Sequence, residues 1–84
     1  MMDQEKSNVV IISAPQSKMA RAATGLGVRE LAEQAGVSPN TIARLERGEE
    51  LKNSTLAAIR AALEAAGVEF IAGNGGGPGV RIKK

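Results

Sequence analysis

The side chains best suited to chemistry lie in one short segment, where Asn40, Arg44 and Arg47 follow one another on a predicted helix. An arginine can donate two hydrogen bonds to O6 and N7 of guanine, and an asparagine can pair in the same way with N6 and N7 of adenine. Each such pair discriminates between bases by ~1–3 kcal/mol. Arginines on a helix surface are by default solvated charges, so base recognition requires a fold that presents this helix to DNA.

Other chemistry is excluded by residue types that the chain lacks. The 84 residues include no cysteine and no histidine. Their absence removes disulfides, thiolate metal ligands, cysteine nucleophiles and the commonest general base. We therefore expect no enzymatic activity, no catalytic residues, no metal and no cofactor. The net charge of +2 and the pI near 9.4 permit nucleic-acid binding without demanding it.

Two short helices are predicted around this segment. Residues 28–35 place their apolar side chains on one stripe at spacings of three and four, and Gly36 ends that helix. Ser38 is a good N-cap for the next helix, Pro39 suits its first position, and Gly48 stops it. So short a connection prevents the two helices from running antiparallel, and they should cross at a steep angle.

Small and apolar residues within these helices support the same geometry. Ala32 is small enough for the helices to touch, and Ile42 and Leu45 would hold the second helix against the rest of the domain. Together with the turn glycine, they predict a helix-turn-helix. Further helices are predicted over residues 16–24 and from a cap at Asn53 or Ser54 to Gly67. Residues 68–71 and 80–83 should form a hairpin, with an inner face made by Val68, Phe70, Val80 and Ile82.

The segment from Arg29 to Gly48 reads RELAEQAGVSPNTIARLERG. It resembles the Cro and lambda-repressor type of helix-turn-helix regulators, also called the xenobiotic-response-element family. The patterns LAxxAGVS and IxxLExG are specific to this type, and weaker similarity extends over roughly Pro15 to Gly67. The resemblance implies that residues 28–35 lie across the DNA backbone, while the recognition helix, residues 38–47, enters the major groove.

The resemblance also implies roles for individual residues of the recognition helix. Base-reading positions fall at Pro39, Asn40 and Arg44, of which Pro39 can supply only apolar contact. Thr41 would lie near the DNA backbone or a thymine methyl group. These positions would carry the sequence specificity.

Other residues that match the family pattern would anchor or stabilise the domain. Ser38 and Arg47 would contact phosphates and fix the register without reading sequence. Arg21 and Glu46 occupy the positions of a structural salt bridge that is typical of the family. We expect the loss of one partner to cost ~3–5 kcal/mol, because it strands a charge.

The sequence departs from the family pattern at Gly27 and Val28, where related proteins often have Ser or Thr followed by a Gln that contacts phosphate. The cap of the helix over residues 28–35 and one DNA anchor are both weakened. Glu30 lies near the positive end of this helix and should compensate in part for the missing cap.

The two ends of the chain lie outside the resemblance, which assigns residues 14–67 to the DNA-binding domain. Residues 1–13 read as an arm with a short strand, because residues 9–12 are four consecutive β-branched residues. Left uncovered, they would form an exposed apolar patch. They either add a strand to the hairpin of residues 68–84 or pair with a second chain. We favour a homodimer through these terminal β elements, since one recognition helix reads few base pairs.

We therefore predict a mainly α fold, a four- to five-helix lambda-repressor-like domain with a C-terminal β-hairpin and an N-terminal strand. The predicted function is a sequence-specific regulator of transcription that binds double-stranded DNA. The cytoplasm is the expected compartment and no membrane contact is expected, because the longest apolar run, residues 9–12, is far too short for a span. The alternative is an antitoxin-like or co-regulator module that binds another protein.

Overall fold

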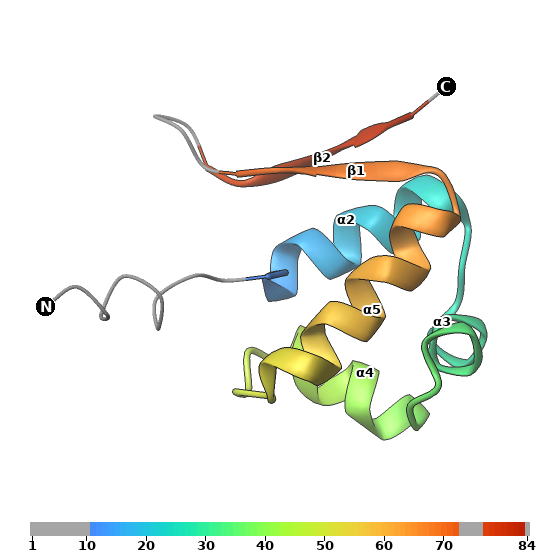
Figure 1. Ribbon diagram of the computed structural model, residues 1–84, viewed down its shortest axis with the longest axis vertical. Helices are drawn as coiled ribbons and strands as arrows, with labels where there is room; N and C mark the ends of the chain where they lie inside the picture. Colours follow the sequence, from blue (N-terminus) through green and yellow to red (C-terminus); the bar gives the residue numbers. More distant parts are fainter. Residues whose placement is uncertain (1–10, 73–76, 84) are drawn as a thin grey trace, which may run out of the picture.

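The computed structural model describes residues 11–72 and 77–83, and this part of the chain is mainly helical (Figure 1). Its helices are α2 (Ala14–Thr24), α3 (Val28–Ala35), α4 (Pro39–Glu46) and α5 (Asn53–Ala65). An antiparallel hairpin of β1 (Val68–Ile71) and β2 (Gly79–Ile82) follows. The predicted mainly α fold with a C-terminal hairpin is confirmed.

Local signals set most of the helix ends. Ser13 caps α2 by accepting the N–H of Gln16, whose side chain in turn accepts the N–H of Ser13. The helix closes at Gly25, which has the left-handed φ of 78°. The predicted cap of α5 is wrong by one or two residues, because Lys52 precedes the helix and Asn53 already lies within it.

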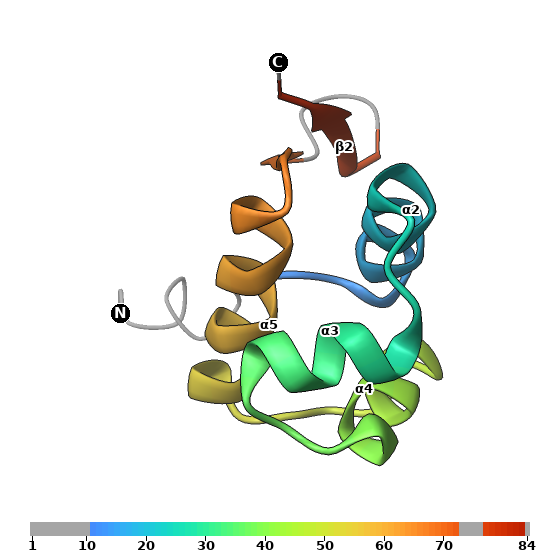
Figure 2. The ribbon, with the colours of Figure 1, turned by 90° about the vertical axis from the view of Figure 1, so that its right-hand side faces the viewer.

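The helices share one core of aliphatic side chains with the start of the hairpin. The buried members come from every helix, from β1 and from the bend before α2: Ile12, Ala20, Leu31, Ala32, Ile42, Leu45, Ile59, Leu63 and Val68. Figures 1 and 2 show the hairpin over α2 and α5 at one end of the molecule, with α4 at the opposite end. The core therefore holds one face of α4, and α4 lies at the end of the domain farthest from the hairpin.

The hairpin is held by a polar contact as well as by the core. The Gln16 amide donates to the carbonyl oxygens of Ile71 (3.2 Å), at the end of β1, and Gly79 (3.1 Å), at the start of β2. The predicted inner face has the right register, because Val68 is paired with Ile82. The two strands differ in burial at this pair, with Val68 of β1 1% exposed and Ile82 of β2 55% exposed.

The strand predicted over residues 9–12 is not found at its last two residues, Ile11 and Ile12, which lie in a bend. Residues 9 and 10 lie outside the described part of the chain. Ile12 is only 1% exposed and belongs to the core of its own chain. The carbonyl oxygen of Ile11 accepts a hydrogen bond from Arg60 of α5, whose guanidinium also lies 5.2 Å from the centre of the Phe70 ring. Burial in the core, and not sheet pairing, covers Ile12.

Candidate nucleic-acid interface

A tight turn sets the angle between α3 and α4. Gly36 has φ 75°, which closes α3, and the N–H of Val37 reaches back to the carbonyl of Ala32 at 3.0 Å. The Ser38 hydroxyl then accepts the N–H of Thr41 at 3.2 Å, and Pro39 begins α4. The chain thus changes direction between Gly36 and Ser38, so that α4 starts almost at once.

The two faces of α4 have opposite characters. Ile42 and Leu45 are 0% and 3% exposed and pack in the core. The predicted DNA-contacting residues lie on the remaining surface: Ser38, Pro39, Asn40 and Arg47 are exposed, and Thr41 and Arg44 are partly exposed. The helix is slightly shorter than the predicted 38–47, because Ser38 is its N-cap and Arg47 its C-cap.

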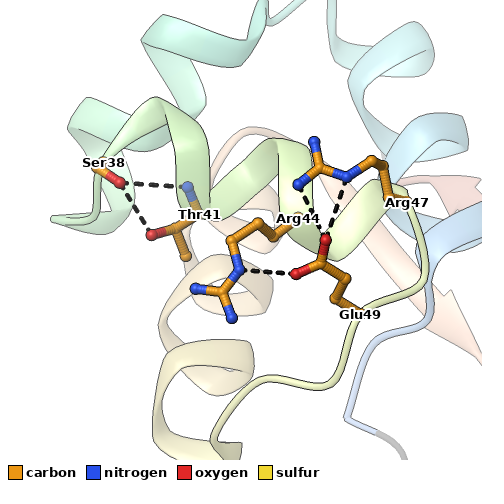
Figure 3. A network of polar contacts seen from close by, with 5 residues as sticks. All are labelled: Ser38, Thr41, Arg44, Arg47 and Glu49. Carbon is orange, nitrogen blue, oxygen red and sulfur yellow. Dashed lines mark hydrogen bonds and ion pairs between the residues drawn. The ribbon is translucent and has the colours of Figure 1, made fainter.

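The structure brings the predicted polar residues into two groups (Figure 3). The hydroxyls of Ser38 and Thr41 lie 3.0 Å apart at the start of α4. At its other end, Arg44 and Arg47 both donate to the carboxylate of Glu49. Among the described residues, Asn40 has no hydrogen-bonding side-chain partner, so its amide is available to a ligand. Donors and acceptors therefore line the exposed face of α4 from end to end.

A comparison with known families gives this surface its context. A family model described as a helix-turn-helix domain matches residues 18–70, which include α3, α4 and all of α5. The chain belongs to this helix-turn-helix family. The match confirms the resemblance to the Cro and lambda-repressor type that residues 29–48 predicted. It supports a DNA-binding role for the chain, on a fold that is not enzymatic.

No curated protein sequence matches the chain. Within residues 11–72 and 77–83, no helix is long and apolar enough to cross a membrane. The same residues hold no group of three or more acidic, histidine or cysteine side chains that could bind a metal ion.

A partly buried ion pair ties the helix-turn-helix to α2. Glu46 accepts hydrogen bonds from Arg21 Nε (2.8 Å), Arg21 Nη2 (2.7 Å) and the Ser17 hydroxyl (2.7 Å). The side chain of Glu46 is 10% exposed and that of Arg21 is 24% exposed. Burial alone would raise the pKa of Glu46, but the hydrogen bonds from Arg21 and Ser17 outweigh it and hold the pKa below its usual range. Arg21 and Glu46 thus form an ion pair that joins α2 to the last turn of α4.

The contacts of two polar residues, Ser17 and Glu49, were not predicted from the sequence. Ser17 is a buried serine that completes the contacts of Glu46. Glu49 lies outside the predicted recognition helix, yet its carboxylate pairs with both Arg44 and Arg47. A signal for Glu49 was present in Gly48, whose φ of 89° turns the chain back toward α4.

The weak cap of α3 is also visible in the helix-turn-helix. Gly27 has no side chain with which to cap the helix, but its own N–H donates to the Glu30 carboxylate at 2.9 Å. Glu30 therefore supplies half of a capping box, in addition to a negative charge near the positive end of α3.

Proposed function

We propose that the chain is a sequence-specific regulator of transcription that inserts α4 into the major groove of double-stranded DNA. The observation that carries the proposal is the two-faced character of α4, which is anchored by Ile42 and Leu45 and exposes a row of hydrogen-bonding side chains. A helix of this kind fits the major groove, where each base pair presents a distinct pattern of donors and acceptors. The cytoplasm is the compartment we propose for this activity.

The proposed roles divide α4 between reading and anchoring. Asn40 and Arg44 read bases, and Pro39 adds apolar contact at the exposed start of the helix. Ser38, Thr41 and Arg47 contact the DNA backbone, where they fix the register of the helix. This division is supported by the position of Ser38 and Thr41, whose hydroxyls lie together at the N-terminus of α4. Backbone N–H groups at a helix N-terminus bind phosphates well.

Selection of bound sequences from a random DNA pool tests this function. We expect the full chain to select one sequence, and Arg44→Ala to relax the preference at one base pair by ~1–3 kcal/mol. Arg47→Ala should weaken binding to all sequences alike and reduce the salt slope by about 1. Selection of no sequence, with no shift of DNA at low salt, would overturn the proposal and leave the protein-interaction alternative.

We further propose that the chain binds DNA as a homodimer joined along β2. The N–H of Lys83 donates to the carbonyl oxygen of Gly67, so these two residues form a hydrogen-bonded pair of the hairpin. Hydrogen-bonded and non-hydrogen-bonded pairs alternate along antiparallel strands. The N–H and C=O groups of Val80 and Ile82 therefore point away from β1. These groups can form hydrogen bonds with a strand of a second chain at the outer edge of β2, where the side chain of Ile82 is exposed.

Edge pairing also suits one DNA duplex. The hairpin lies over the helices at the end opposite α4 (Figure 2). Two copies related by an axis perpendicular to the sheet would therefore direct both α4 helices to the same side. Stacking of the outer sheet faces would instead turn the two helices away from each other, so one duplex could not contact both.

Ile82→Lys tests the dimer, with Met19→Lys as its matched control, because Met19 is the other large apolar side chain exposed in the described part of the chain. We expect light scattering to give twice the chain mass of 8.7 kDa for the wild type and for Met19→Lys. Ile82→Lys should give the single mass, since a lysine on an edge strand disfavours pairing. A dimer that survives Ile82→Lys would move the interface away from β2.

A further inference from the structure

Glu49 is held against Arg44 at two points. Its backbone N–H donates to the carbonyl oxygen of Arg44 at 3.0 Å, across the turn that Gly48 makes at the end of α4. Its Oε1 accepts from Arg44 Nε at 2.9 Å (Figure 3). The guanidinium of Arg44 therefore contacts a residue that lies outside α4 and is itself bonded to the backbone of Arg44.

The position of this contact on the guanidinium decides what remains available. Glu49 uses only Nε of Arg44, and the terminal Nη1 and Nη2 donate to no other residue in the described part of the chain. These two nitrogens form the fork that can donate to O6 and N7 of a guanine. Arg47 differs, because it gives both Nε (3.2 Å) and Nη2 (2.9 Å) to Glu49 Oε2 and keeps a single terminal nitrogen.

We propose that Glu49 is a positioning residue for base recognition: it holds Arg44 by Nε, so that the free end of the guanidinium is oriented to read one guanine. This inference rests on the proposed function of α4. A long arginine side chain otherwise loses rotamer freedom when it binds, and a contact that fixes it beforehand reduces that loss.

The charge of Glu49 also acts on the affinity for DNA of any sequence. Hydrogen bonds from Arg44 and Arg47 lower the pKa of Glu49, which is therefore ionised at neutral pH. One negative charge offsets part of the two positive charges that face the DNA. Attraction to phosphates is independent of sequence, so this charge weakens binding to random DNA and to the selected site alike, and only the contact with Arg44 distinguishes the two.

The test separates position from charge with three variants of the full chain. Glu49→Gln removes the charge and retains the shape of the side chain, whereas Glu49→Asp retains the charge but draws the carboxylate back by one methylene. Glu50→Gln is the matched control, because Glu50 is equally charged, exposed, and without a hydrogen bond or ion pair among residues 11–72 and 77–83. Dissociation constants are measured at one salt concentration for three duplexes. These are the selected site, the site altered at the base pair that Arg44→Ala identifies, and a random sequence.

We expect Glu49→Gln and Glu49→Asp to lower the discrimination at that base pair by about three- to tenfold, part of the roughly 5- to 150-fold that a bidentate arginine supplies. Glu49→Gln and Glu50→Gln should both bind random DNA more tightly, but Glu50→Gln should keep the wild-type discrimination. Wild-type discrimination in both Glu49 variants, or an equal loss in Glu50→Gln, would overturn the inference while leaving DNA binding intact. A wild type that selects no sequence would instead refute the proposed function itself.

Discussion

Replacement of Arg21 by methionine tests how strongly the Arg21, Glu46 and Ser17 cluster joins α2 to α4. Arg21 donates two of the three hydrogen bonds that the Glu46 carboxylate accepts, and Glu46 is only 10% exposed. Removing one partner of a fully buried pair costs ~3–5 kcal/mol. Because Arg21 itself is 24% exposed, water can reach the vacated side, and we expect a smaller loss of about 2–3 kcal/mol.

Urea denaturation followed by circular dichroism measures this loss. The midpoint should fall with an unchanged m value, and the melting temperature should drop by about 10–20 °C for a domain of this size. If the variant is unfolded in buffer, trimethylamine oxide restores a measurable transition. Arg81→Met is the control, because the Arg81 and Glu69 pair is largely exposed and its loss should cost less than about 1 kcal/mol.

A double variant isolates the stranded charge as the cause. Arg21→Met with Glu46→Leu should be more stable than Arg21→Met alone by about 1 kcal/mol or more, because no partly buried carboxylate is left without its arginine. A loss for Arg21→Met no larger than that for Arg81→Met would refute this account. Strict additivity of the two changes would do the same.

The other predictions concern acid stability, the cap of α3 and the attachment of the hairpin. The folded pKa of Glu46 lies below its unfolded value, so its contribution to stability is complete above about pH 4.3 and is lost as the pH falls through the folded pKa. The wild type should therefore lose more stability in acid than Glu46→Gln does, and equal losses in urea titrations would contradict this. Gly27→Ser should raise the free energy of unfolding by about 0.5–1 kcal/mol, because Gly27 has an extended backbone that serine adopts and lacks a capping side chain; Gly36→Ser, at φ 75°, should instead lower it by about 1–2 kcal/mol. Gln16→Met should cost about 1–2 kcal/mol and speed hydrogen exchange at the Lys83 amide, while slow exchange there would show that the hairpin does not need this side chain.

The helix-turn-helix could be predicted from sequence because local residues decide it. Gly36 adopts a conformation that other residues avoid, and Ser38 and Pro39 satisfy the first turn of α4 without help from distant parts of the chain. Ile42 and Leu45 follow at helical spacing and are buried as expected. Each of these signals acts within a few residues, so the order of the residues is sufficient.

The features that sequence missed depend on tertiary contacts. The β-branched run at residues 9–12 favours a strand, but Ile12 instead enters a core whose shape is set by all the helices. The position of Glu49 depends on the rotamers of two long arginines and on the turn at Gly48, none of which has a periodic pattern. Likewise, the amide of Gln16 meets carbonyl groups more than fifty residues away along the chain.

The stacking of Arg60 on Phe70 gives the molecule an internal spectroscopic reporter. Phe70 is the single aromatic residue of the chain, so any ring-current shift in its proton spectrum has one source. The Arg60 guanidinium lies 5.2 Å from the ring centre and comes from α5, whereas the ring comes from β1. The Arg60 side-chain protons should resonate upfield only while the hairpin is seated on α5. Their chemical shift therefore measures the population of seated hairpins directly, with no added label.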